Sequence, residues 1–348
     1  MENKRSKPAL PAGRYFKYAI GEIVLVVIGI LIALQVNNWN EKQAQDDKTI
    51  AIFNQIIDDM IIDVRVIQNA NEFFIYKDSL IDVYRKTDLK SIPKSSDSVL
   101  SEDHLVDLIR TFAPIELHDR GFNLLTDHID QVDKKYEKYV DELVYLYQDK
   151  KPLIDLYYDR LKTILYEHRM YKIKNFAWYS RMNKTNKRDQ EEYEYYKFNP
   201  IYKNYVRFYN DMIYNLAINL RNFEDLTIKF SRQLNYDFKL GRDIDKELGF
   251  KNPSKELLQS ISGNYLIRDK DTLSFIEKNG QLYESTLDNQ QIVYVFERMI
   301  KVGELRYLGD SIFYRNYKEN LKVNKDGSLT VFSFTNTRED KLKLLNND

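Results

Sequence analysis

A chain of 348 residues is long enough for two domains, and its 43% hydrophobic content can supply a sizeable core. Lys plus Arg and Asp plus Glu are both 53, so the formal charge is zero. This balance argues against a nucleic-acid partner, because such proteins usually carry a basic surface. The absence of cysteine excludes disulfides, thiolate metal sites and cysteine nucleophiles. The 27 Tyr and 18 Phe residues are interpreted as aromatic packing between helices, with a carbohydrate- or peptide-binding surface as the alternative.

An apolar stretch near the N-terminus is the first clear element. Residues 19–38 read AIGEIVLVVIGILIALQVNN, and their only charge is Glu22. About 20 apolar residues are needed to cross a bilayer, and Tyr18 and Trp39 lie where interfacial aromatic residues are typical. A buried core helix is the alternative, but an apolar run without a polar face has no side to expose to water. The sequence therefore predicts a transmembrane helix over residues 19–38.

The charges around this helix predict its orientation. Residues 1–18 carry five basic residues against one acid, whereas acids outnumber bases directly after the helix. Because basic flanks stay in the cytoplasm, residues 1–18 are expected to be a cytoplasmic basic segment and the long C-terminal part to be exported. A signal-peptide cleavage site needs small residues one and three positions before the cut; Ala33 could fill one position, but Leu31 fails the other. We therefore expect an uncleaved signal anchor. The basic residues are Lys4, Arg5, Lys7, Arg14 and Lys17.

One face of the predicted transmembrane helix carries small residues and the single charge. Glu22, Gly29 and Ala33 share this face with two valines, and Gly29 and Ala33 have the small-xxx-small spacing that lets helix backbones approach closely. Ionisable groups inside membrane spans are often functional, so these three residues are a candidate membrane-helix interface for a homo-oligomer. The alternative is that Glu22, near the cytoplasmic edge, extends to the lipid headgroups.

The segment from Tyr15 to Glu41, YFKYAIGEIVLVVIGILIALQVNNWNE, resembles the opening of an uncharacterised single-pass membrane family of Bacteroidota. The resemblance is nearly residue for residue over this segment. Beyond it the likeness is general, a helical block followed by a variable C-terminus. The resemblance implies an inner-membrane location with the C-terminal body in the periplasm, and it implies neither an activity nor catalytic residues.

Residues 39–240 are predicted to form a helical bundle, because only Gly121 interrupts them and glycine is costly inside helices. The first bundle helix shows a seven-residue period. One row is Phe53, Met60, Ile67, Phe74 and Ile81, and its companion row is Ile50, Ile57 and Val64. The period is typical of a helix in an antiparallel bundle, with a parallel coiled-coil dimer as the alternative. Whether the anchor helix continues unbroken into this helix stays open.

Further bundle helices follow from apolar spacing and from the prolines, which are expected at helix boundaries. The predicted helices cover residues 99–112, 119–149, 153–180 and 201–238, and the prolines are Pro93, Pro114, Pro152 and Pro200. The segment 183–197 is highly charged and is expected to be a solvated loop or helix rim.

After residue 240 the pattern changes. Seven glycines lie between residues 241 and 348, which places a domain boundary between about residues 240 and 258. Asn279-Gly280 and Asp326-Gly327 are hairpin turn signals, and six to eight short strands, one of them through Ile292, Tyr294 and Phe296, predict a small antiparallel, barrel-like β domain over residues 258–340. Three segments resemble small lipocalin-like β modules appended to serine hydrolases. They are Ile261–Tyr265, Asn279–Tyr283 and Leu321–Ser328.

Motifs that carry chemistry are lacking in the sequence. The four histidines do not have the spacing of metal ligands on helices, and neither a GxSxG nor an HExxH motif nor a glycine-rich phosphate loop occurs. Adjacent carboxylates such as Asp58-Asp59 and Glu191-Glu192 are interpreted as solvated helix rims. No catalytic residue, metal site or cofactor is predicted. The histidines are His104, His118, His128 and His168.

The sequence as a whole predicts an α+β membrane protein with one transmembrane helix, a periplasmic helical bundle and a small β domain. The first functional hypothesis is a non-enzymatic sensor, adaptor or scaffold that binds a protein partner in the periplasm. The second is a ligand-binding module whose β domain holds a small apolar or sugar ligand. The third is an enzyme with an unrecognised site.

Overall fold

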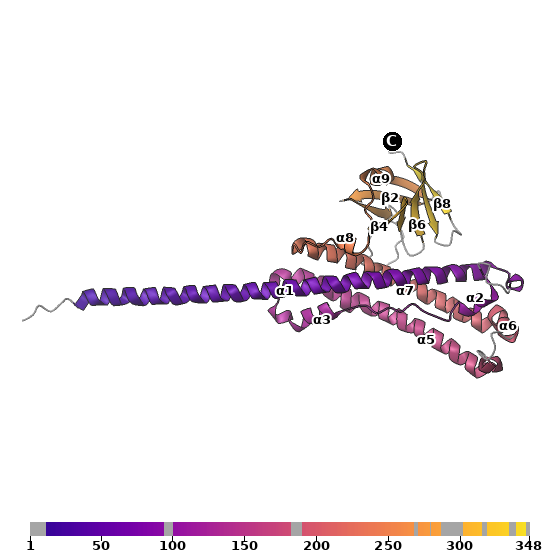
Figure 1. The fold of residues 1–348 in the computed structure, drawn as a ribbon, viewed down its shortest axis with the longest axis horizontal. Helices are drawn as coiled ribbons and strands as arrows, with labels where there is room; N and C mark the ends of the chain where they lie inside the picture. The colour runs from indigo at the N-terminus through magenta and orange to yellow at the C-terminus, as the bar shows by residue number, and fades with distance from the viewer. Residues whose placement is uncertain are drawn as a thin grey trace, which may run out of the picture.

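Helices occupy the chain up to residue 261, and strands follow (Figure 1). The computed structural model describes residues 12–93, 100–181, 190–267, 271–278, 280–286, 302–314, 319–333 and 339–345. The helices are α1 (Ala12–Lys86), α2 (Glu102–Asp107), α3 (Arg120–Asp127), α4 (Glu137–Val144), α5 (Lys151–Asn175), α6 (Gln190–Phe198), α7 (Pro200–Asp237), α8 (Ile244–Glu247) and α9 (Lys255–Ile261).

Helix α1 runs unbroken for 75 residues, from the apolar N-terminal stretch into the bundle. At 1.5 Å per residue it is a rod of roughly 110 Å, and its N-terminal part projects alone from the body (Figure 1). The side chains from residue 20 to residue 45 are exposed, Leu25 to 70%. In the described part of the chain, this is the one helix that is long and apolar enough to cross a membrane. The predicted anchor and the first bundle helix are therefore a single helix.

The α1 residues that recur every seven positions lie in the core of the bundle. Every member of the row from Phe53 to Ile81 is at most 2% exposed, and the helix packs against α3 and α7 of the same chain. Ile57 and Val64 of the companion row are buried as well. The interpretation as a bundle helix is confirmed. Because the row from Phe53 to Ile81 is covered by other helices of the same chain, it is not free to form the seam of a parallel coiled-coil dimer.

The later helices differ from the prediction in their bounds. Helix α7 agrees closely with the predicted range 201–238 and begins at Pro200, where a missing N–H costs nothing. Of the described part of the predicted helix 99–112, only Glu102–Asp107 is α-helical, as α2. The predicted helix 119–149 is divided into α3, two single 3₁₀ turns and α4.

The expected helix boundary at Pro152 is present as a change of helix type, because α5 begins at Lys151 with Pro152 in its first turn. A π-helical segment, Tyr145–Lys150, joins α4 to α5, and the backbone stays helical through both junctions. Proline cannot donate to the carbonyl four residues earlier and its ring crowds that carbonyl. A wider π turn directly before the proline removes the regular four-residue pairing there, so the helix passes through the site.

The solvated loop or helix rim expected over residues 183–197 is found on only one side of α6, where Gln190, Glu191 and Glu194 are exposed. Residues 182–189 lie outside the described ranges, and the remainder belongs to α6. Glu192, Tyr195 and Tyr196 of α6 share one face and are buried. Lys197, also buried, lies 2.5 Å from the carboxylate of Glu102 on α2. The charge density of the segment concealed an aromatic face.

Eight strands form a closed antiparallel barrel in which every strand pairs with its sequence neighbours and β1 pairs with β8. They are β1 (Gly263–Ile267), β2 (Asp271–Lys278), β3 (Gln281–Thr286), β4 (Val302–Gly309), β5 (Ile312–Tyr314), β6 (Glu319–Val323), β7 (Leu329–Ser333) and β8 (Glu339–Leu344). The predicted barrel-like β domain is thus observed, with its last strand ending four residues beyond the expected limit of 340.

The barrel encloses a core of its own side chains. Phe275, Phe313, Leu321 and Leu329 are buried in it, and this core is separate from that of the bundle. The Asp326-Gly327 turn predicted between two strands joins β6 to β7, with Gly327 at a φ of 80° that favours glycine. The predicted strand through Ile292, Tyr294 and Phe296 lies outside the described residues, as does Asn279 of the other predicted turn.

The segment between bundle and barrel is tied to both long helices. The Arg242 guanidinium contacts the carboxylates of Asp58 on α1, at 2.8 Å, and Glu247 on α8, at 2.6 Å. Arg232 of α7 makes an ion pair with Asp245 at 2.5 Å. As a result α8 lies along the bundle, and the barrel sits beside α1 and α7 (Figure 1).

Two buried aspartates of α1 hold the start of α3. Asp59 accepts a hydrogen bond from the Gly121 N–H at 2.7 Å, and Asp63 accepts one from the His118 N–H at 2.7 Å. A Cβ on Gly121 would lie 2.7 Å from Ile56, so only glycine allows this close approach. Burial raises the pKa of Asp63 from its ordinary value of 3.8 to about 7, although the hydrogen bonds from His118 oppose the shift.

The raised pKa of Asp63 makes a prediction about stability. Between pH 4 and pH 7 the folded protein keeps a proton that the unfolded chain has released, so the free energy of unfolding should fall as the pH rises through this window. The loss is at most about 1.4 kcal/mol per pH unit. Asp63→Asn should remove this pH dependence of the free energy of unfolding, because the amide stays neutral. Urea unfolding of the full-length protein in detergent, followed by the fluorescence of buried Trp178, measures it.

Asp127→Asn is the matched control, because Asp127 is an exposed carboxylate on α3. This variant should keep the wild-type pH profile. A wild-type slope that persists unchanged in Asp63→Asn would contradict the assignment to Asp63.

Candidate ligand site between the bundle and the barrel

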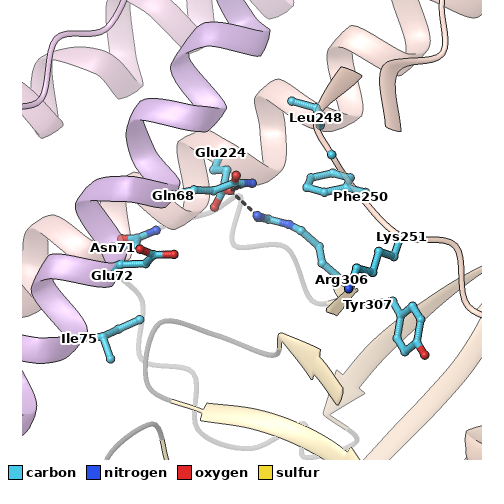
Figure 2. Close-up of a pocket in the computed structure, with 11 residues that line it drawn as sticks. Gln68, Asn71, Glu72, Ile75, Glu224, Leu248, Phe250, Lys251, Arg306 and Tyr307 are labelled. Atoms are coloured by element: carbon cyan, nitrogen blue, oxygen red, sulfur yellow. Dashed lines mark hydrogen bonds and ion pairs between the residues drawn. The ribbon is translucent and has the colours of Figure 1, made fainter. Parts of the chain in front are cut away.

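Arg306 connects the barrel to the bundle. Its neighbour Leu305 is in the barrel core, so strand alternation directs Arg306 outward from β4. The side chain is nevertheless only 6% exposed, because α1 and α7 cover this face. The guanidinium makes an ion pair with Glu224 of α7 (Figure 2) and a second one with Asp225 of α7 at 3.0 Å.

The bundle supplies the other half of a charge cluster. Arg221, one turn before the two acids on α7, lies 3.1 Å from Asp225 and 3.5 Å from Glu224. Gln68 of α1 donates a hydrogen bond to Glu224 at 3.2 Å. Arg221, Glu224, Asp225 and Arg306 are together called the junction cluster. Its formal charges, two positive and two negative, cancel.

Burial and pairing act in opposite directions on the pKa values of the junction cluster. Burial raises the pKa of Asp225, while Arg221 and Arg306 lower it without cancelling the shift. For Arg306 burial alone would lower the pKa, but Glu224 and Asp225 outweigh burial and hold its pKa above the ordinary value. The Arg306 cation also lies 5.6 Å from the ring centroid of Phe250. Arg306 is therefore charged at every physiological pH.

A cavity of about 290 Å³ opens beside the junction cluster. Residues of α1 form one wall, Glu224 and the segment after α8 form the second, and β4 forms the third (Figure 2). The lining residues are Gln68, Asn71, Glu72, Ile75, Glu224, Leu248, Gly249, Phe250, Lys251, Arg306 and Tyr307. The site thus combines polar side chains with an apolar side made by Ile75, Leu248 and Phe250.

Two hydrogen-bond acceptors that belong to this lining lack a hydrogen bond among the described residues. They are the side-chain oxygen Oδ1 of Asn71 and the oxygen Oε2 of Glu224, which keeps the ion pair with the Arg221 guanidinium at 3.5 Å. Asn71 is 4% exposed and Glu224 is fully buried. A buried acceptor without a donor costs about 1–3 kcal/mol. A molecule with hydrogen-bond donors would offset that cost.

The sequence-predicted interface residues lie elsewhere. Glu22, Gly29 and Ala33 are exposed on the apolar part of α1, and a Cβ on Gly29 would meet no atom of this chain within 4 Å. The helical geometry places the three on one face, as expected from their spacing. Their role as an interface between membrane helices stays a prediction.

Three of the histidines have roles in the fold. His104 caps α2 by accepting the Ser101 N–H at 3.0 Å, and His118 contacts Asp63. His168 lies 3.0 Å from the Tyr195 hydroxyl, and burial lowers the pKa of His168 to about 3, so it is neutral. Across the described ranges, no three His, Asp or Glu side chains gather as a metal ion would require.

The sequence held a signal for the junction cluster that the prediction missed. Glu224 follows Leu216 and Leu220 at four-residue intervals, so it belongs to the buried face of α7. A charge on an apolar helix face needs a partner. Arg306 could not be matched to it from sequence, because the two residues are 82 positions apart.

Removing Arg306 should release the barrel from the bundle. Arg306→Met leaves Glu224 and Asp225 with Arg221 as their one cationic partner among the described residues, and breaking a buried ion pair typically costs about 3–5 kcal/mol. Exposing the acids to water by undocking the barrel avoids this cost. Because the chain has no cysteine, spin labels can be placed at Arg207→Cys and Lys343→Cys, both exposed. Double electron–electron resonance should show a narrow distance distribution that Arg306→Met broadens.

Lys86→Met provides the comparison. It breaks an ion pair with Asp82 whose side chains are 65% and 37% exposed, and such pairs contribute at most about 1 kcal/mol. The distance distribution of this variant should match that of the parent. An equally narrow distribution in Arg306→Met would show that the junction cluster does not hold the barrel.

Comparison with known proteins is informative for one segment of the chain. Residues 22–115 match a family of unknown function, DUF6090. The match begins inside the apolar stretch of α1, continues through α2 and covers less than half of the chain. No curated protein and no solved structure matches the chain. The N-terminal part of the protein, including α1, is therefore similar to an uncharacterised family.

Proposed function

We propose that this protein is a non-enzymatic sensor or adaptor of the bacterial envelope, anchored in the inner membrane by α1 and carrying its bundle and barrel in the periplasm. The observation that carries the proposal is the double role of α1. Its apolar stretch has the length of a membrane span, and Gln68, Asn71 and Ile75 of the same helix line the junction cavity.

The coupling between these two parts of α1 is direct. From residue 38 to residue 68 the helix covers roughly 45 Å without a break. A change at the junction that turns or tilts the body together with α1 therefore reaches the membrane through a single rigid element. A flexible tether between membrane and body would not transmit such a change.

Polar contacts fix the helix where it enters the bundle. Lys42 makes an ion pair with Asp133 at 3.0 Å, and Lys135 makes one with Asp46. Both contacts join α1 to the turns between α3 and α4. They hold the direction in which α1 leaves the body, which favours a role that depends on orientation.

The proposed orientation is tested with a reporter phosphatase that is active only in the periplasm, fused after residue 348. The basic excess in residues 1–18 predicts an active fusion. A fusion between residues 18 and 19 should be inactive. A stable but inactive C-terminal fusion would reverse the topology.

The proposed coupling is tested by rotating the body about α1. Two alanines inserted after Asn40, which is exposed between the apolar stretch and the bundle, rotate the bundle by about 200°. Seven alanines rotate it by about 700°, close to two full turns, and preserve the facing side. In cells lacking the native copy, the seven-alanine variant should restore the wild-type transcript profile and the two-alanine variant should not.

A body released from the membrane is the companion experiment. Replacing residues 1–38 by a cleavable signal peptide keeps the bundle and the barrel but removes the anchor. This form should also fail to restore the profile. Full restoration by the released body or by the two-alanine variant would contradict a sensor that acts through α1.

A further inference from the structure

The junction cavity offers both partners of a hydrogen bond to a small molecule. Among the described residues, the buried acceptor Asn71 Oδ1 lacks a hydrogen bond, and Glu224 Oε2 lies 3.5 Å from the Arg221 guanidinium without a hydrogen bond. The ammonium group of Lys251 and the amide of Gln68 line the same space and are donors. Ile75 and Phe250 give the cavity an apolar side.

We infer that the junction cavity binds a neutral polyhydroxyl ligand of about the size of a monosaccharide. A hydroxyl donates one hydrogen bond and accepts others, so a ring of hydroxyls satisfies the acceptors and the donors of the lining together. The C–H groups of such a ring pack against the apolar side. The junction cavity is also part of the proposed function, and this inference assigns it a ligand. The inference rests on the proposed function only in what ligand binding would signal.

The charges of the site favour a neutral ligand. The junction cluster is balanced internally, since Arg221 and Arg306 face Glu224 and Asp225. The remaining charges of the lining, those of Glu72 and Lys251, are exposed and opposite in sign. Among the described lining residues, a cation or an anion would meet no net opposite charge, and it would lose its hydration.

The size of the cavity limits the ligand. A volume of about 290 Å³ is at the small end of ligand pockets, which span roughly 300–1,000 Å³. A lipid chain or a peptide segment is too large, whereas a single sugar or cyclitol fits. The site lies outside the barrel, in whose core Phe275 and Phe313 are buried. It therefore differs from the ligand site expected inside the β domain, which stays a prediction.

Binding is measured on the full-length protein in lipid nanodiscs by saturation-transfer difference NMR. The probes are D-glucose, D-galactose and myo-inositol, with putrescine as the cationic and acetate as the anionic comparison. At least one polyol should receive saturation and neither charged probe should. Asn71→Leu should weaken binding at least tenfold, because it removes one acceptor. Asn71→Leu should not lower the melting temperature, because the substitution removes a buried acceptor that has no donor.

Asn123→Leu is the matched control, since Asn123 is exposed on α3 away from the cavity, and it should bind as the wild type does. Ile75→Trp fills the cavity and should abolish binding. Saturation of putrescine or acetate in place of the polyols, no saturation of any probe, or polyol binding unchanged in Asn71→Leu and Ile75→Trp would overturn the inference. The two-alanine insertion after Asn40 leaves the cavity intact, so it should bind normally, and a failure of α1 coupling is distinguishable from a failure of binding.

Discussion

The guanidinium of Arg306 lies where water cannot solvate it, and this constraint sets the relation between the two halves of the protein. A buried cation is tolerated only with charged partners and well-placed hydrogen bonds. Those partners are Glu224 and Asp225, which lie on a helix of the bundle, so the barrel must stay against α7 for the charge to be neutralised. The pairing contributes little favourable free energy relative to apolar packing, but it specifies one arrangement. The junction cavity exists because that arrangement leaves space beside the cluster.

Helix α1 fixes how the bundle and the barrel are oriented relative to the apolar stretch. Its heptad row packs in the bundle core, so the helix cannot rotate within the body without exposing Met60, Ile67 and Phe74. From residue 20 onward its apolar stretch is exposed and has no such partners among the described residues. Helix α1 thus has two environments: protein surrounds one part and, in the proposed function, lipid surrounds the other. The same backbone hydrogen bonds run through both parts.

The parts of the fold that follow from local pattern could be predicted from the sequence. The apolar stretch, the heptad row from Phe53 to Ile81 and the Asp326-Gly327 turn each depend on residues close in the chain, and the structure agrees with them. Pro152 lies in the first turn of α5 as expected, but the π turn before it has no clear sequence signal and could not be predicted. Tyr195 and Tyr196 were obscured by neighbouring charges. The candidate site could not be predicted, because it joins residues of α1, α7 and β4 whose only link is the tertiary fold.

The closure of the barrel restricts how another protein can recognise it. Each of the eight described strands has a hydrogen-bonded neighbour on both sides, since β1 completes the ring with β8. Open sheets recruit peptides by adding a strand to an edge, and they risk uncontrolled aggregation through the same edge. Among the described strands, the closed ring leaves few unpaired backbone groups for such pairing. A partner that docks on these strands therefore recognises mainly side chains, which differ between proteins.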